Sequence, residues 1–178
     1  MKTAKFGGSS LASAAQIRKV CDIITADTSR RLIIVSAPGK RTAQDTKVTD
    51  LLIQAAEARL THQDGEQEMG LVEARYVEIA SGLGLEQDDV DPIIADLRHR
   101  LQADTADEGL FLDTMKAAGE ANRARLTAAF LRHRGVDAHY VDPGEAGMIL
   151  SDEPGNARVL TQSYGRLRGL RDRAGITI

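Results

Sequence analysis

A lysine and two glycines near the amino terminus form a pattern that can hold an anion. The segment Lys5–Ser10 follows a short predicted strand, Thr3–Phe6. Gly7 and Gly8 have no side chains, so backbone N–H groups there can approach a bound group closely, and Lys5 adds a full positive charge. Tight turns of this kind also connect strands to helices without any ligand. Taken alone, the pattern favours the ordinary turn over a phosphate site.

Two polar segments come after the next predicted strand, Leu32–Val35. The loop Ser36–Arg41 adds a hydroxyl, a glycine and two cations, and the segment Asp45–Leu52 places polar side chains at the start of a helix. Thr46 or Asp45 could cap that helix. Thr49 lies one turn further on, where its hydroxyl could point at a ligand instead. The loop Ser36–Arg41 is also compatible with a solvated basic loop.

A Gly-Glu pair lies within a long helical pattern, Leu110–Arg134. A glycine in a helix costs about 1 kcal/mol relative to alanine, so Gly119 indicates either a helix break or the close approach of a ligand or another backbone. The carboxylate of Glu120 could receive an ammonium group. The alternative is a surface glutamate paired with Arg123 or Arg125, and the pair alone favours that alternative.

The elements that position these residues predict an α/β fold. Strand, helix and strand over Thr3–Phe6, Ser13–Ala26 and Leu32–Val35 form a βαβ unit, so the two strands should be parallel. Loops at the carboxyl ends of such strands are where open α/β sheets bind ligands. Further helices are predicted over Val48–Leu60, Gln67–Ala80, Pro92–Ala103, Leu110–Arg134 and Arg158–Arg173, and short strands over Val136–Val141, Met148–Leu150 and Ile176–Ile178.

The composition argues against several classes of function. A net charge of −3 over 178 residues leaves no basic stripe for nucleic acid, and no apolar run is long enough to span a bilayer. The single cysteine, Cys21, cannot form an intramolecular disulfide and fits a reducing compartment. The amino terminus is not a secretory signal. We therefore expect a cytoplasmic protein with no metal site, since the four histidines lack ligand spacing.

Four segments together resemble one enzyme family. Lys5–Ser10 resembles the opening signature of aspartokinases, Val35–Arg41 and Asp45–Leu52 resemble the next segments of those enzymes, and Gly119-Glu120 falls where that family carries its Gly-Glu substrate element. The similarity runs in order from Lys2 to about Val141 and more loosely to Ile178. It implies the amino acid kinase fold, a three-layer αβα sandwich with a mainly parallel sheet. It also implies one domain over 1–178 that is incomplete at the C-terminus, without the nucleotide-binding half and the ACT regulatory domains.

The resemblance implies a transferase that uses ATP to phosphorylate the β-carboxylate of L-aspartate, giving 4-phospho-L-aspartate at the start of lysine, threonine and methionine biosynthesis. Thr49 and Glu120 would bind aspartate, with Glu120 taking its α-ammonium group. The implied phosphate- and ATP-binding residues are Lys5, Phe6, Gly7, Gly8, Ser9 and Ser36, with Lys5 also catalytic. A carboxylate nucleophile is already ionised at neutral pH, so the enzyme needs no general base. Mg2+ is expected on the phosphates.

Two other functions stay open from the sequence. The chain could be a non-catalytic interaction module or remnant with the same fold, or a family member with another acceptor such as glutamate, carbamate or a nucleotide. If half of a kinase domain is missing, activity of this chain alone would be impaired or lost. Exposed apolar surface would then favour self-association, so we expect a homo-oligomer.

Overall fold

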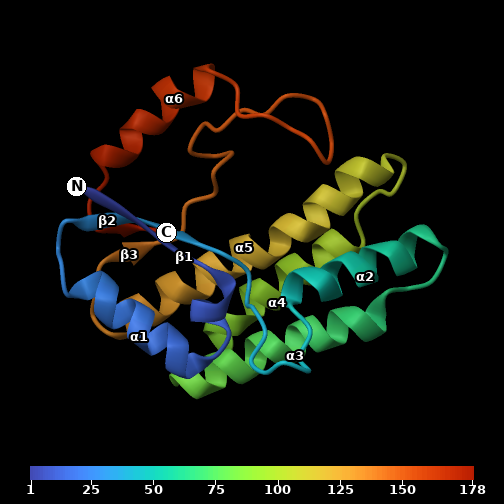
Figure 1. The fold of residues 1–178 in the computed structure, drawn as a ribbon, viewed down its shortest axis with the longest axis horizontal. Coiled ribbons are helices and arrows are strands. Elements are labelled where there is room, and N and C mark those ends of the chain that lie inside the picture. The colour runs from blue at the N-terminus through green and yellow to red at the C-terminus, as the bar shows by residue number, and fades with distance from the viewer.

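The computed structural model describes all residues, 1–178, and shows helices packed around a small parallel sheet (Figure 1). Along the chain the elements are β1 (Lys2–Phe6), the short helix η1 (Gly8–Leu11), α1 (Ala14–Thr25), β2 (Arg30–Val35), α2 (Val48–Leu60), α3 (Glu66–Leu83), α4 (Gln87–Leu101), α5 (Glu108–His133), β3 (Ala138–His139), α6 (Gln162–Leu167), the short helix η2 (Arg168–Arg171) and β4 (Ile176–Thr177). None of these helices is both long enough and apolar enough to cross a membrane.

The four strands form one sheet in the order β1-β2-β4-β3, and every pair in it is parallel. β1 and β2 are joined through α1, which confirms the predicted βαβ unit. In their register Phe6 lies opposite Val35. The loops after the two strands therefore leave the sheet at the same edge, side by side.

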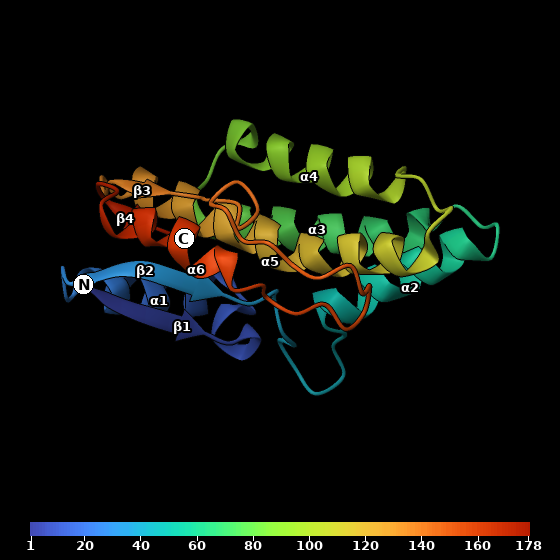
Figure 2. The same cartoon turned by 90° about the horizontal axis from the view of Figure 1, so that it is seen from above.

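The sheet separates a thick helical layer from a thin one. Ile33 and Val35 are buried in the main core. Ile34 lies between them on β2, so its side chain points to the opposite face of the sheet, where it is 46 % exposed. In Figures 1 and 2, α1 covers the first face of the sheet, and α6 lies on the opposite side. The predicted α/β class with a mainly parallel sheet is confirmed.

Helices α2 to α5 lie side by side and hold most of the apolar core (Figure 2). Because aromatic residues make up only 3 % of the chain, this core consists mainly of aliphatic side chains. The helix α5 is its central member and packs against both α2 and α4. Ser13, the first residue of the predicted helix range, caps α1, since the backbone N–H of Gln16 donates to Ser13 Oγ at 3.4 Å.

The predicted start of the fourth helix is wrong. α4 begins at Gln87, and Pro92 lies inside it instead of at its first position. Proline there removes one backbone hydrogen bond. The buried residues Val90, Ile93 and Leu97 form a continuous apolar stripe across the proline, and the burial of that stripe outweighs the missing bond.

Other boundaries also differ from the sequence-based expectation. α5 runs unbroken through Gly119. The predicted helix Arg158–Arg173 is reduced to α6 and η2, because Ser163 is the only buried residue in either and no apolar stripe anchors a longer helix. The predicted strand Met148–Leu150 forms only a single bridge, between Leu150 and Val159. The strand expected over Val136–Val141 is limited to β3.

Candidate active site

A polar cleft of about 410 Å³ opens at the carboxyl ends of β1 and β2. Three segments far apart in the sequence meet there: the turn after β1, the loop between β2 and α2, and the middle of α5. The lining residues are Gly8, Ser9, Ser36, Ala37, Pro38, Gly39, Lys40, Lys47, Thr49 and Glu120. The parallel register explains the meeting of the first two segments, and the packing of α5 brings in the third.

Five of the predicted site residues line this cleft, namely Gly8, Ser9, Ser36, Thr49 and Glu120. The other three are not part of its lining. Lys5 is an exposed residue of β1 beside Ile34, and the side chain of Phe6 packs against the core. Gly7 precedes η1, in an extended conformation. The structure therefore separates the predicted set into five residues that line the cleft and three, in β1 and just after it, that do not.

Two of the glycines are required by a close contact between the two strand-end loops. The backbone N–H of Gly39 donates to the carbonyl oxygen of Gly8 at 2.9 Å. A Cβ atom on Gly8 would lie 2.8 Å from the carbonyl oxygen of Ala37, and one on Gly39 would lie 2.7 Å from the carbonyl carbon of Gly8. Since the obstacles are backbone atoms, a side chain at either position would push the loops apart.

The glycine within α5 also permits a close contact, here with a side chain. A Cβ atom on Gly119 would lie 2.7 Å from Ala37 Cβ, so the missing side chain lets α5 touch the β2–α2 loop. The hydroxyl of the buried Tyr76 donates to the carbonyl oxygen of Gly119 at 2.8 Å, and burial raises the pKa of that hydroxyl. Beside it, Glu120 Oε1 accepts from the backbone N–H of Ala37 at 3.3 Å.

An arginine of α3 holds the β2–α2 loop in place. Arg75 is only 4 % exposed, and it donates to the carbonyl oxygen of Gly39 at 3.2 Å and to Asp45 Oδ1 at 2.6 Å. Arg41 donates to Asp45 Oδ2 at 3.0 Å from its Nε and also pairs with Glu78. The Arg41 hydrogen bonds hold the pKa of the Asp45 carboxyl well below its usual range.

The expectation that Thr46 or Asp45 caps α2 is wrong, because the Asp45 carboxylate is engaged by these arginines and Thr46 does not occupy the N-cap position. Lys47 is the N-cap residue of α2, and no side chain caps that end. Sequence reasoning also missed Arg75. Its signal was its place between Val72, Tyr76 and Ile79, on the buried side of α3, where an arginine needs internal partners.

The alternative role for Glu120, pairing with a nearby arginine, does not occur. Arg125 pairs with Asp96 at 3.1 Å, and Arg123 is fully buried with its guanidinium 5.5 Å from the centre of the Tyr76 ring. Lys40, Lys47 and Glu120 form no ion pair with any residue of the chain. The cleft thus presents one free carboxylate and two free ammonium groups.

A second hollow, apolar and about 570 Å³ in volume, lies on the other face of the sheet. Leu32 and Ile34 of β2 form one of its walls, and the side chains of Leu167 and Leu170 form another. Glu120 borders both hollows. The chain has no group of three or more histidine, cysteine, aspartate or glutamate side chains arranged to hold a metal ion.

The fold and the cleft at the strand ends define the class of protein. The sequence profile of the amino acid kinase family matches residues 3–178, so the chain belongs to the amino acid kinase family. Aspartokinase 3 of Bacillus subtilis is 48 % identical over 178 residues, which are the whole of this chain and 39 % of that protein. Chloroplastic aspartokinase 2 of Arabidopsis thaliana is 29 % identical over 164 residues, 90 % of this chain and 30 % of the plant protein. The chain thus spans about two fifths or less of these relatives.

Solved structures agree with this family. The aspartate kinase of Clostridium acetobutylicum superposes with a TM-score of 0.77 at 28 % identity, over 98 % of this chain and 37 % of that enzyme. E. coli aspartokinase III, solved in complex with aspartate and ADP, gives a TM-score of 0.76 at 21 % identity, over 99 % of this chain and 39 % of its own. The second likeness shows the shared fold alone.

Proposed function

We propose that this chain supplies the aspartate-binding part of an aspartate kinase, a phosphotransferase with a carboxyl group as acceptor. The reaction is the ATP-dependent phosphorylation of the β-carboxylate of L-aspartate to 4-phospho-L-aspartate. The observation that supports it is the convergence of Gly8, Ser36, Thr49 and Glu120 on one polar cleft. The 48 % identity to a Bacillus subtilis aspartokinase over the whole chain gives independent support.

In this proposal Glu120 receives the α-ammonium group of aspartate. Its carboxylate has no ion-pair partner in the chain and accepts only the N–H of Ala37, so it can take a cationic group. The hydroxyl of Thr49, in the first turn of α2, binds the same substrate. The β-carboxylate is ionised at neutral pH, so the site has to position it and stabilise charge during transfer, without removing a proton.

The phosphoryl group is assigned to the strand-end side of the cleft. Gly8, Ser9 and Ser36 line that side, with Phe6 and Gly7 completing the turn. Lys5 of β1 is the catalytic cation of the proposal, because a positive charge there can stabilise the charge on the transferring group. Its position on the neighbouring strand requires that the phosphoryl group lie above the end of β1 instead of deep in the cleft.

ATP is the proposed phosphoryl donor, in keeping with the E. coli enzyme of the same fold that was solved with aspartate and ADP. Glu120 is the only carboxylate that lines the cleft, so Mg2+ would be held by the phosphate oxygens and not by a set of acidic side chains. Bound there, Mg2+ neutralises phosphate charge. We further propose a role in lysine, threonine and methionine biosynthesis, a cytoplasmic location and a homo-oligomeric state.

Isothermal titration calorimetry of the chain with L-aspartate and with ATP–Mg2+ tests this function. The variant Glu120→Gln keeps the shape of the side chain and removes its charge. Loss of a charge-assisted hydrogen bond should weaken aspartate binding about tenfold or more. The matched control is Glu57→Gln, an exposed and unpaired glutamate of α2, which should bind as the parent does.

Aspartate binding that is unchanged in Glu120→Gln would overturn the role of this residue. A chain that binds neither aspartate nor ATP–Mg2+ would favour a non-catalytic module instead. Binding of L-glutamate in preference to aspartate would point to another acceptor. Each of the last two outcomes contradicts the proposed function as a whole.

A further inference from the structure

One positive charge in the core of the protein has no partner. Arg123 of α5 is fully buried, and none of the three nitrogen atoms of its guanidinium group has a hydrogen-bond partner in the chain. The group lies over the ring of Tyr76, 5.5 Å from the ring centre. Burial lowers the pKa of Arg123 to about 10, so the group still carries its charge at neutral pH. Because an unpaired buried charge destabilises a fold, stability does not explain this residue.

The other buried arginine of the chain is paired. Arg75 donates to the carbonyl oxygen of Gly39 and to the carboxylate of Asp45. No carboxylate pairs with Arg123, and that of Glu120, one turn before it on α5, accepts a backbone N–H of the β2–α2 loop instead. Since the side chain of Arg123 is fully enclosed, nothing that binds to the surface of the protein can reach it without opening the core.

Arg123 lies behind the wall of the polar cleft. Side chains in a helix lean toward its amino end, so Arg123 covers the turn of α5 that contains Gly119 and Glu120. Tyr76, against which the guanidinium packs, donates its hydroxyl to the carbonyl oxygen of Gly119. Gly119 in turn touches Ala37, a lining residue of the cleft. Tyr76 and Gly119 therefore connect the buried charge to the cleft wall.

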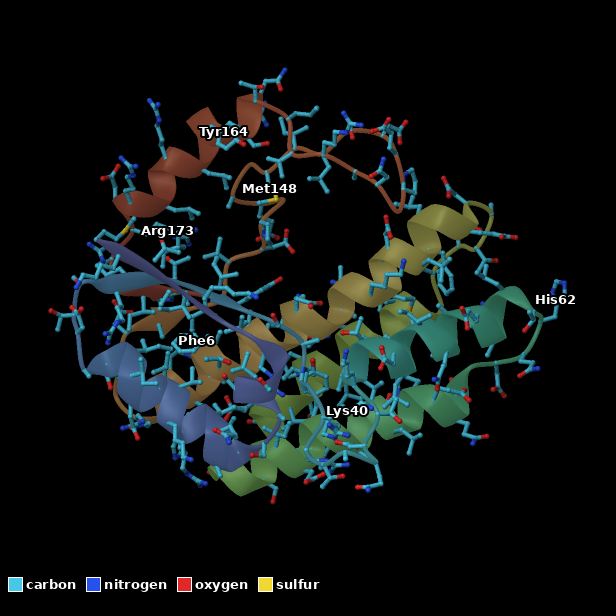
Figure 3. All side chains as sticks on the ribbon, in the orientation of Figure 1. Phe6, Lys40, His62, Met148, Tyr164 and Arg173 are labelled. Atoms are coloured by element: carbon cyan, nitrogen blue, oxygen red, sulfur yellow. The ribbon has the colours of Figure 1, made fainter.

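A second connection runs through α3. The β2–α2 loop, marked by Lys40 in Figure 3, lies against this helix, and Arg75 holds its Gly39 carbonyl. The charge of Arg75 contributes to the lowered pKa of Arg123, so the two guanidinium groups are close enough to interact. Asp45 pairs with Arg75 and leaves Arg123 uncompensated. In the protein interior, which screens charge less than water does, such a group acts on its surroundings at longer range.

We propose that Arg123 strengthens the binding of an anionic ligand in the polar cleft through its charge, without touching the ligand. This inference rests on the proposed function and adds a residue to it. The free chain contains an uncompensated positive charge behind the cleft, and a bound ligand of net negative charge offsets it. The residue then lowers the stability of the free protein and raises its affinity, as residues at functional sites often do.

The test compares the parent with Arg123→Met, which has a similar length and no charge. In denaturant unfolding without ligand, the variant should unfold at a higher denaturant concentration than the parent, because an apolar side chain replaces an unpaired buried charge. In calorimetric titrations with L-aspartate, whose net charge is negative at neutral pH, the variant should bind about three- to tenfold more weakly. A gain in stability together with a loss of affinity is not expected from damage to the fold.

The matched control is Arg168→Met, which makes the same change in net charge at an exposed arginine of η2 without an ion pair. It should match the parent in stability and in aspartate affinity. Repeating the titrations at high salt adds a second readout. The affinity lost in Arg123→Met should stay lost there, because ions in solution do not screen an enclosed charge.

Each possible failure has its own signature. If Arg123→Met unfolds at a lower denaturant concentration than the parent, or does not fold, the charge supports the core and the inference is overturned. If the variant is stable and binds aspartate as the parent does, while Glu120→Gln weakens binding, the inference is overturned and the proposed function stands. A loss of affinity that disappears at high salt also overturns it. A parent chain that does not bind aspartate contradicts the inference and the proposed function together.

Discussion

The two hollows that meet at Glu120 differ in what forms their walls. The polar cleft is built mainly from loops, and its shape depends on backbone contacts at Gly8 and Gly39 that leave no room for a Cβ atom. The contact of Gly119 with the Ala37 side chain adds α5 to its wall. The apolar hollow is built from side chains, some on regular elements, such as Ile34 on β2, and others on the segment that follows β3, such as Met148. Close backbone contacts leave little room for adjustment, whereas side chains can change rotamer to fill space. We conclude that the cleft is suited to recognising a small charged ligand, and the apolar hollow to packing.

The largest expected effect comes from removing the residue that holds the cleft loop. Arg75→Met leaves the Gly39 carbonyl without its side-chain donor and leaves the Asp45 carboxylate with Arg41 as its only ion-pair partner. We expect a loss of about 3 kcal/mol in the free energy of unfolding, since the Gly39 carbonyl and the Asp45 carboxylate each lose a buried hydrogen bond and Asp45 loses one of its two ion-pair partners. Aspartate binding should be lost as well. Denaturant unfolding and calorimetry measure the two effects.

The pH dependence gives a control for this variant. The pKa of Asp45 is depressed in the folded state, so its contribution to stability is complete above about pH 4 and is lost as the pH falls further. The stability difference between the parent and Arg75→Met should therefore shrink in acid. A difference that is small at pH 7, or that does not change on acidification, would show that Arg75 does not anchor the loop through Asp45.

A smaller effect is expected from adding one methyl group between the loops. In Gly39→Ala the new Cβ atom would meet backbone atoms of Gly8 and Ser9 at 2.7 to 2.9 Å, so the loops must separate, at a cost of about 1 to 3 kcal/mol. The matched control is Gly70→Ala in α3, where nothing lies within 4 Å of the new atom. That control should gain up to about 1 kcal/mol through helix propensity. Equal stability of the two variants, measured by denaturant unfolding, would show that the loops after β1 and β2 do not touch closely at Gly39.

The smallest effect should come from the apolar hollow. Ile34 is already 46 % exposed, so Ile34→Ser should cost less than about 1 kcal/mol of stability. It should leave aspartate affinity unchanged and reduce the fluorescence of an apolar dye bound to the protein. If aspartate binding falls instead, the two hollows are not independent, and the comparison between them fails.

Much of the fold could be predicted from local patterns. The strands β1 and β2, the helix α2 and the cap at Ser13 are consequences of apolar spacing and turn residues that depend only on nearby sequence. The start of α4 differs from the prediction because the apolar stripe across Pro92 overrides the preference of proline for the first helical position. The segment containing α6 was overestimated because a helical pattern of basic residues has little apolar surface to bury.

The sequence predicts the residues of the candidate site better than it predicts the contacts between them. Gly119 indicated a close approach, but only the packing of α5 shows that Ala37 is the neighbour. Arg75 and Lys47 were not predicted to belong to the site. Their roles depend on how α3 and α2 meet the β2–α2 loop, and sequence spacing does not encode such contacts between distant segments.

The most direct test of an aspartate site in the polar cleft is a titration with L-aspartate monitored by amide chemical shifts in a 15N-labelled chain. We expect the amides of Gly8, Ala37 and Gly39, around the polar cleft, to shift with a common saturation curve. The amides of Leu167 and Leu170, beside the apolar hollow, should not move. Shifts confined to the apolar hollow, or no shifts at saturating aspartate, would contradict the assignment of aspartate to the cleft.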